Sequence, residues 1–537
     1  MSTAARLRWP RIAPGFALLL AAALVPPVAR GARHRRPRTT HTTTGSLSRQ
    51  IDALLATPQA AQARWGISIT TLDGRVLYEK NDTGLFAPAS NTKLVTTSTA
   101  LGLLGPDMTI ETRVVAPAAP DAQGVIHGDV SLMGAGDASM SGRAYPYNGS
   151  TQRPNPPLAA IDDLAQQLQQ RGVRHITGGI VGDDTAFVWE PYGSGWAWDD
   201  LEWSWGAPVS ALTINDNLAF LTLAPGPTPG SPLTYSWNPS IIGEFYSIDN
   251  EGRTSTAGSQ ASPGFDRPLG SREFRIFGTL PAGGAPHHLA VAISDPAQVA
   301  ADALRAALIA RGITVDGPAT ARHRLSQDTA IFEQSVLRPL MLGAPRPQPP
   351  APAGTVVLAS RTSVPLLEDM TVTNKVSQNL HAEIFLRLLG QRLAEDASIE
   401  EGLRVTRAFL LRAGVSPQDF FFYDGSGLSP EDRMTPRAFT QLLRYDAAQP
   451  WGAEFRSTLP VGGVDGTLSD RFLHSPLRGK IFAKTGTLNE VNSLSGYLIS
   501  RRGHTLVISI LCNAHSPEDQ SLTHVMDRIA NAVAATD

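Results

Sequence analysis

The sequence predicts a mixed α/β (α+β) fold: an antiparallel sheet flanked by helices, with an inserted, mostly β region. Three observations support this prediction. Strand-like hairpins occur near both ends of the chain, helical patterns lie between them, and the middle of the chain is rich in aromatic residues, Gly and Pro. At 537 residues the chain is too long for one ordinary core, so we expect two or three domains.

The N-terminal residues have the pattern of a secretory signal. Three arginines precede a short apolar run over residues 12–25, and small residues follow it. Because this run is shorter than the roughly 20 residues that a spanning helix needs, we interpret 1–31 as a signal peptide rather than an uncleaved anchor. Residues 32–46 form a basic, Thr-rich tract that we interpret as a flexible linker and as a candidate for association with a membrane surface. The sequence thus predicts export across the inner membrane, to the periplasm or cell envelope.

The two chain ends are predicted to build one domain. Residues 66–81 have the pattern of two strands around an Asp-Gly turn, 494–513 repeat it, and 517–533 have helical apolar spacing. We expect this domain to span 47–107 and 291–537.

Residues 108–290 differ from the rest of the chain. They hold strand-like runs and few long helical patterns, so we expect two inserted, mostly β domains there. A helical pattern follows from Pro296.

Charge and cysteine content exclude some classes of function for this chain. A formal net charge of -2 argues against a general nucleic-acid surface, which needs a basic excess. The single cysteine, Cys512, excludes an intramolecular disulfide, and its apolar setting, VISILC, predicts a buried strand residue rather than a reactive thiol. An exported chain without disulfides favours a bacterial envelope protein.

Lysine is unusually rare in this chain. Of 46 lysine and arginine residues only five are lysines, and they are Lys80, Lys93, Lys375, Lys480 and Lys484. Because arginine cannot lose its proton in a protein and a buried lysine can, proton transfer is one task in which arginine does not replace lysine. The five lysines are therefore candidates for chemistry.

Ser90 and Lys93, in PASNTKLVTTSTAL, are either a catalytic pair or the polar start of a helix. On a helix, residues three apart lie on one face, so Lys93 can reach the Ser90 hydroxyl. A desolvated lysine beside a second cation, for which Lys484 is the candidate, can have a pKa low enough to activate a serine.

Two further motifs follow in order. Ser377-Gln378-Asn379 is either a polar helix cap or a site in which Ser377 relays a proton between Lys93 and a leaving amine and Asn379 orients a substrate amide. Lys484-Thr485-Gly486 lies in a stretch, IFAKTGT, with the pattern of an edge strand to which a peptide can add. Lys484 and Thr485 would bind a carboxylate there, and the Thr487 and Ser90 backbone N–H groups would form an oxyanion hole.

The three motifs resemble the S-x-x-K, S-D-N and K-T-G signature of penicillin-binding proteins and class A β-lactamases. The long separation between Ser90 and Ser377 resembles the class C penicillin-binding proteins, the D-alanyl-D-alanine carboxypeptidase/endopeptidase family of penicillin-binding protein 4 type. Further segments are similar to that family, and they are GAGDAS, GDDTAF, WGAPVSALTINDN, DGSGLSP and LPVGGVDGTL.

The resemblance implies a serine transpeptidase/β-lactamase-like domain with two domains inserted after the catalytic helix. It implies a serine-type peptidase that removes the terminal D-Ala of peptidoglycan stem peptides, or cleaves their cross-links, through an acyl-enzyme on Ser90. β-Lactams would act as inhibitors at the same serine. No metal or organic cofactor is implied.

Asp200, in GWAWDDL, is the position that matches a family aspartate able to approach the amine of the substrate's third residue, with Trp205 nearby. An exposed loop carboxylate is the alternative. The chain departs from the family after DGSGLS, where Pro430 replaces a common arginine and Arg433 follows three residues later.

Three other classes of protein are alternatives. The absence of a G-x-S-x-G motif around Ser90 disfavours a Ser-His-Asp hydrolase. A β-lactamase or related esterase shares the acylation step and differs in rapid deacylation. A non-catalytic peptidoglycan-binding protein predicts that Ser90 has no role.

Overall fold

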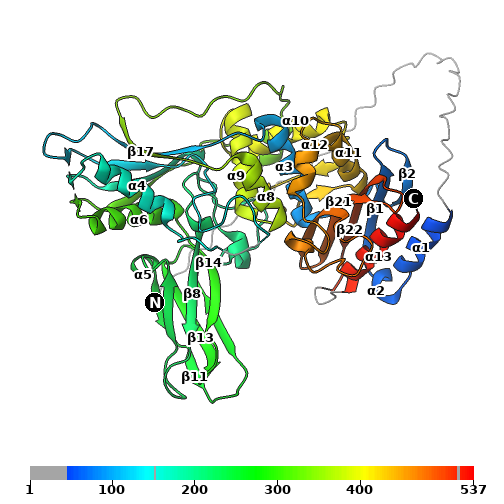
Figure 1. Ribbon diagram of the computed structural model, residues 1–537, viewed down its shortest axis with the longest axis horizontal. Coiled ribbons are helices and arrows are strands. Elements are labelled where there is room, and N and C mark those ends of the chain that lie inside the picture. Colours follow the sequence, from blue (N-terminus) through cyan, green and yellow to red (C-terminus); the bar gives the residue numbers. More distant parts are fainter. Residues whose placement is uncertain (1–44, 150–152, 517–520, 537) are drawn as a thin grey trace, which may run out of the picture. The chain divides into compact units, whose positions relative to one another are not determined.

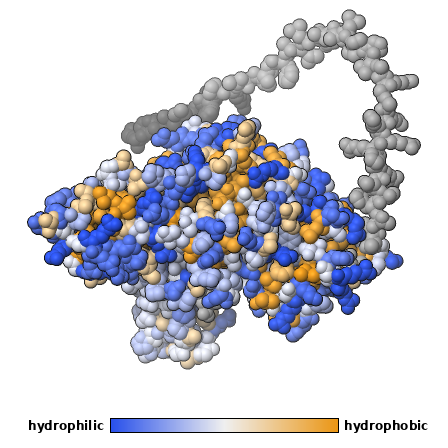
Figure 2. Space-filling model, turned by 45° about the horizontal axis from the view of Figure 1, so that its top comes forward, coloured by the Kyte–Doolittle hydropathy of each residue, from blue (hydrophilic) through white to orange (hydrophobic). Residues whose placement is uncertain are grey.

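The computed structural model describes residues 45–149, 153–516 and 521–536. The expected signal peptide and all but the end of the expected linker lie outside these residues. Helix α1, Gly45–Leu55, includes the last two residues of that linker. No helix in the described part of the chain is long and apolar enough to cross a membrane. On the face shown in Figure 2, apolar patches are interrupted by hydrophilic side chains.

An antiparallel five-stranded sheet joins the two chain ends (Figure 1). Strand β1 pairs with β22 along its whole length, from Arg64 opposite Asn513 to Thr71 opposite Leu506. In spatial order the strands are β2 (Val76–Lys80), β1 (Arg64–Thr71), β22 (Thr505–Asn513), β21 (Val491–Ile499) and β20 (Ile481–Leu488). The predicted hairpins are confirmed, and β20 is an edge strand as expected.

Both faces of this sheet are covered by helices. Alternate residues of β22 face opposite sides: Ile508 and Ile510 pack with helices α1 and α13 (Ser521–Thr536), whereas Val507 and Leu511 pack with the other helices. Burial on both faces explains why the strand is a continuous apolar run, and Cys512 is buried in it as predicted. The other helices are α3 (Thr92–Leu104), α8 (Leu366–Lys375), α9 (Asn379–Leu393), α10 (Ile399–Arg412), α11 (Pro436–Ala447) and α12 (Gly452–Thr458).

Helix α3 lies in the core although it is rich in threonine. Its hydroxyls find acceptors there: Thr97 donates to the carbonyl of Lys93 at 2.5 Å, Thr96 to the carbonyl of Gly425 at 2.7 Å and Ser98 to Asp446 at 2.7 Å. Because buried polar groups need partners, these bonds let a polar helix run through the core and fix the residues at its start.

The inserted region contains a second five-stranded sheet, with helices α4 (Ala159–Gln170) and α6 (Pro296–Ala310) packed beside it (Figure 1). Its order is β16 (Ala319–Arg324), β7 (Ile180–Val188), β5 (Val130–Met133), β3 (Glu111–Ala116) and β17 (Val356–Thr362). Three two-residue strands pair nearby, and they are β4 (Val125–Ile126), β6 (His175–Ile176) and β15 (Thr314–Val315).

Two smaller sheets and the short helix α5 (Ile242–Phe245) form a mostly β extension of the insert, drawn in green in Figure 1. One consists of β14 (His287–Ala292), β8 (Leu218–Ala224) and β9 (Thr234–Asn238). The other consists of β10 (Ser247–Asn250), β13 (Glu273–Pro281), β11 (Arg253–Ser255) and β12 (Ser262–Asp266). These two sheets have the β character expected of the insert, and β14 extends two residues beyond position 290.

The second sheet reaches beyond the expected boundary at residue 291. Helix α6 begins at Pro296 as predicted, with Asp295 accepting from the N–H of Gln298. It packs on β7 and β16, and β17 closes the sheet against β3. We therefore propose residues 47–107 and 363–537 as the catalytic domain, because α6, β16 and β17 share the core of the insert. Helix α7 (Phe332–Leu337), which lies between β16 and β17 in the chain, packs instead with α10 of the catalytic domain, where Val336 is buried.

Candidate active site

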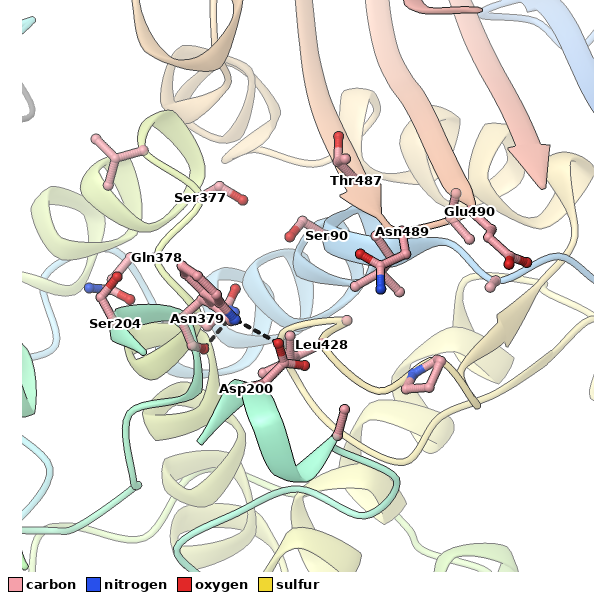
Figure 3. Close-up of a pocket in the computed structure, with 18 of the residues that line it drawn as sticks. Ser90, Asp200, Ser204, Ser377, Gln378, Asn379, Leu428, Thr487, Asn489 and Glu490 are labelled. Carbon is pink, nitrogen blue, oxygen red and sulfur yellow. Dashed lines mark hydrogen bonds between the residues drawn. The ribbon is translucent and has the colours of Figure 1, made fainter. Parts of the chain in front are cut away.

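A cavity of about 950 Å³ is lined by residues of the first two motifs, by Thr487 just after the third motif, and by residues of the insert. Ser90, Thr487 and Asp200 reach it from three separate segments, and Ser377 and Asn379 reach it from one segment (Figure 3). The inserted region supplies Asp200, so it forms one wall of the cavity.

Ser90 lies in a 3-10 turn that leads directly into α3. The turn spans Ala89–Asn91, and Ala89 has φ 47°, a backbone conformation that residues other than Gly seldom adopt. Strand β20 passes close above it: a Cβ on Gly486 would lie 2.8 Å from the backbone nitrogen of Ser90. Glycine is therefore required at 486 for the strand to approach the serine.

Lys93 is completely buried and is bonded to the Ser90 hydroxyl. Its Nζ donates to Ser90 Oγ at 3.0 Å, to Asn379 Oδ1 at 2.6 Å and to the carbonyl of Ser426 at 2.7 Å. Burial lowers the pKa of Lys93 to about 7, and the carboxylates of Asp424 and Glu383 oppose that shift.

Lys93 Nζ has three hydrogen-bond partners, and this number suits proton transfer. A charged ammonium uses all three N–H groups on these acceptors. A neutral amine keeps two of them on Asn379 and Ser426 and presents its lone pair to Ser90. The arrangement can therefore take the proton of the Ser90 hydroxyl without moving the lysine.

The second motif lies at the junction of α8 and α9. Gln378 is the N-cap of α9 and accepts from the N–H of Leu380, so the helix-cap interpretation holds for that residue. Ser377 has φ 61°. The structure places its Oγ against Lys484 Nζ at 2.8 Å, whereas Lys93 contacts Asn379. Asn379 also donates to the carbonyl of Trp205 at 2.8 Å, which links it to the insert (Figure 3).

Lys484 is the second fully buried lysine. Its Nζ donates to Ser377 Oγ and to the carbonyl of Thr485, each at 2.8 Å. Burial lowers the pKa of Lys484 well below its usual value, and the nearby charge of Lys93 lowers it further. The charge of Lys93 therefore disfavours a charge on Lys484. The expected influence of Lys484 on the pKa of Lys93 stays a prediction.

Thr485, in the third motif, and Thr487, just after it, have different surroundings. Thr487 lines the cavity. Thr485 donates to Thr467 Oγ1 at 2.7 Å, so its hydroxyl is engaged with a neighbouring loop.

Asp200 lies at the end of a 3-10 turn, Trp198–Asp200, and lines the cavity. Its Oδ1 accepts from the indole N–H of Trp205 at 2.7 Å (Figure 3). Burial raises the pKa of Asp200, and that hydrogen bond opposes the rise. Arg433 donates to the carbonyls of Pro430 and Asp432, so its guanidinium is held by its own loop.

Sequence reasoning missed the residues behind Lys93. Glu383 accepts from the N–H groups of Gly425 and Ser426, and Asp424 accepts from the N–H of Gly427 and from the indole of Trp196. One signal was available for Glu383, since it stands four residues after Asn379 on a helix and so shares its face. No group of side chains suited to a metal ion occurs among the residues that the structure describes.

Comparison with known proteins gives consistent findings. Residues 47–339 and 347–534 match the model of the D-Ala-D-Ala carboxypeptidase 3 (S13) family. A D-alanyl-D-alanine carboxypeptidase of Actinomadura sp. (strain R39) is 31% identical over 487 residues, which are 88% of this chain and 81% of that protein. The D-alanyl-D-alanine carboxypeptidase DacB of Haemophilus influenzae is 25% identical over 66% of this chain and 69% of its own length.

A solved structure has the same fold. The crystal structure of penicillin binding protein 4 from Haemophilus influenzae superposes with a TM-score of 0.72 at 21% identity, and the match covers 89% of this chain and 98% of that one.

Proposed function

Because the chain belongs to the D-Ala-D-Ala carboxypeptidase 3 (S13) family, and so to the class C penicillin-binding proteins, we propose that it is a serine-type D-alanyl-D-alanine carboxypeptidase of the cell envelope. Its substrates are the stem peptides of peptidoglycan. Cleavage of cross-links between stem peptides uses the same chemistry, and the cavity is bounded by the insert, which supplies Asp200 for the side chain of the substrate.

One observation carries this proposal: Lys93 Nζ lies 3.0 Å from Ser90 Oγ with its pKa lowered to about 7. A substantial fraction of Lys93 is then neutral near pH 7 and can accept the serine proton. The Ser90 oxygen attacks the carbonyl of the penultimate D-Ala, the C–N bond breaks, and the terminal D-Ala leaves as an amine after it gains a proton. Water then hydrolyses the ester on Ser90.

Ser377 and Lys484 are our candidates for the proton delivered to the leaving amine. The Ser377 hydroxyl accepts from Lys484, so its own hydrogen is free to point toward the cavity that it lines. Asn379 supports the same step by holding Lys93 in place. We assign these three residues, with Ser90 and Lys93, as the catalytic group.

The edge of β20 is our candidate for substrate binding. A peptide that adds to this edge would place its terminal carboxylate near Lys484 and Thr485 and its carbonyl near the N–H groups of Ser90 and Thr487. Gly486 keeps that path open, since a side chain there would collide with the turn that carries Ser90. β-Lactams would acylate the same serine. The mechanism uses no metal or organic cofactor.

The place of action follows from the substrate. Peptidoglycan lies outside the cytoplasmic membrane, so we propose that residues 1–31 direct export and that the basic tract at 32–46 contacts a membrane surface.

Two measurements test the proposal. Purified muropeptides are analysed by mass spectrometry before and after incubation: loss of one alanine from monomers reports carboxypeptidase action, and conversion of dimers to monomers reports cleavage of cross-links. Incubation with a labelled penicillin must leave a stable adduct on the protein, whereas rapid turnover of the drug would identify a β-lactamase. Ser90→Ala must abolish both signals, and Ser457→Ala, at an exposed position, serves as the matched control.

A further inference from the structure

We propose that Lys375 and Asp465 form an ion-pair clamp between helix α8 and the loop before β20, and that the clamp positions Ser377 against Lys484. The inference rests on the proposed function and adds two positioning residues outside the three motifs. Neither residue lines the cavity, so their effect would be indirect.

The ion pair is well shielded from solvent. Lys375 Nζ donates to both carboxylate oxygens of Asp465, at 2.8 Å and 2.7 Å, and the two side chains are 5% and 20% exposed. Asp465 also accepts from the N–H of Val461 at 2.9 Å, which fixes the carboxylate to its own loop. Removing one partner would leave the other charge uncompensated in a poorly solvated place.

One end of the clamp lies beside Ser377. Lys375 is the last residue of α8, two positions before Ser377, whose φ of 61° is a conformation that surrounding contacts must hold. The loop approaches this helix end closely: a Cβ on Gly466, which has φ 59°, would lie 2.6 Å from the carbonyl oxygen of Lys375. The ion pair and this close contact therefore set where α8 ends.

The other end of the clamp lies beside Lys484. Thr467, two residues after Asp465, accepts from the Thr485 hydroxyl at 2.7 Å. The same loop pairs with β20 just before the motif, since the N–H of Ala483 donates to the carbonyl of Pro460 at 3.0 Å. The loop is thus bonded to β20 on both sides of Lys484.

The clamp therefore closes a ring of contacts. The ring runs from Ser377 through Lys375 and Asp465 to the loop, from the loop to β20, and from Lys484 back to Ser377 by the 2.8 Å hydrogen bond. A lysine suits this place because its compact ammonium fits between a helix end and a glycine turn. Lys375 is one of only five lysines in the chain, and this role accounts for it without assigning it to the reaction.

The test is the rate constant for acylation of the full chain by a fluorescent penicillin, with thermal unfolding followed in parallel. We expect Lys375→Met and Asp465→Asn each to lower the rate about 10- to 100-fold. In a Ser377→Ala background the same Lys375→Met change should lower the acylation rate less than about threefold, because the hydrogen bond between Ser377 and Lys484 is already lost. Lys480→Met, at an exposed lysine just before β20, is the matched control and should match the wild type.

The outcomes separate the clamp from general stability. Equal fold losses in the two backgrounds, or wild-type rates for Lys375→Met, would overturn the inference. If Lys375→Met fails to fold, Asp465→Asn in the same two backgrounds decides the question at the more exposed partner. Failure of the proposed function is distinct, because then the wild type itself forms no adduct or Ser90→Ala still forms one.

Discussion

Lys93 on α3 and Lys484 on β20 have equal burial and different electrostatic surroundings. Neither side chain is exposed to solvent. Lys93 faces a loop that is anchored by Asp424 and Glu383, and these carboxylates hold its pKa at about 7. The acceptors of Lys484 are the Ser377 hydroxyl and a carbonyl, and its pKa falls well below the usual value.

The comparison shows how one residue type can serve two roles. Burial lowers the pKa of both lysines. Nearby carboxylates raise the pKa of Lys93 into the range in which the side chain can both accept and give up a proton near neutral pH. A general base needs a pKa in this range. Lys484, without such compensation, is suited to respond to a negative charge brought by the substrate.

Replacing Lys93 should have the largest effect. Lys93→Met removes the base, and we expect the rate of acylation by a penicillin to fall by about 10²- to 10⁴-fold. The Lys93→Arg variant should show an equally large fall in the acylation rate, because a guanidinium cannot give up its proton. Lys80→Met, at an exposed lysine, provides the control. A Lys93→Arg variant that retains activity would contradict the assignment of a base.

Replacing Lys484 should have a smaller effect. Lys484→Met leaves Lys93 able to accept the serine proton, so we expect an acylation rate about 10- to 100-fold lower, the loss typical of one hydrogen bond to a charged group. A peptide ending in a free carboxylate should lose more than the same peptide with its end amidated. Equal losses for both peptides would show that Lys484 does not contact the carboxylate.

The pH dependence of acylation tests the carboxylates behind Lys93. With a pKa of about 7, Lys93 becomes protonated as the pH falls, and the rate should fall about tenfold per unit below pH 7. Asp424→Asn removes a charge that stabilises the ammonium, so the pKa of Lys93 should fall and the acid limb should move about one unit lower. A stopped-flow profile of the acylation rate from about pH 5 to about pH 9 measures this shift. Movement of the limb to higher pH would refute the role of Asp424.

Asp432 should have the smallest effect. Burial and the neighbouring Asp424 raise the pKa of Asp432 well above its ordinary value, and Asp432 contributes least of the three carboxylates that raise the pKa of Lys93. Asp432→Asn keeps a group that can bond the Thr92 hydroxyl, and we expect the acid limb to move by less than about 0.3 units. A shift as large as that of Asp424→Asn would show that Asp432 is ionised beside Lys93.

The residues in the three motifs could be predicted from the sequence because their geometry is partly local. Ser90 and Lys93 are three apart on a helical turn, and the apolar pattern of the terminal hairpins already implied one sheet. The fold class, the edge position of β20 and the burial of Cys512 are confirmed for the same reason.

Other features depend on packing that no local pattern encodes. Helix α6 has an apolar face that would fit either sheet, so its place in the insert could not be read from its residues. The left-handed conformation of Ser377 and its contact with Lys484, rather than Lys93, arise from segments that meet only in the folded chain. Of the carboxylates behind Lys93, Glu383 lies on α9 and Asp424 lies in a loop, and the approach of that loop to α3 is likewise a tertiary event.

The pairing of β1 with β22 determines when the enzyme can become competent during its synthesis. Ser493 donates to the carbonyl of Pro88, two residues before the nucleophile, across a separation of 405 residues. The turn that presents Ser90 is thus completed by residues that the ribosome adds about 400 residues later, and contacts of such long range form late in folding. A chain that still lacks these strands therefore has no support for the turn that carries Ser90, and the site can form only after nearly the whole polypeptide has been synthesised.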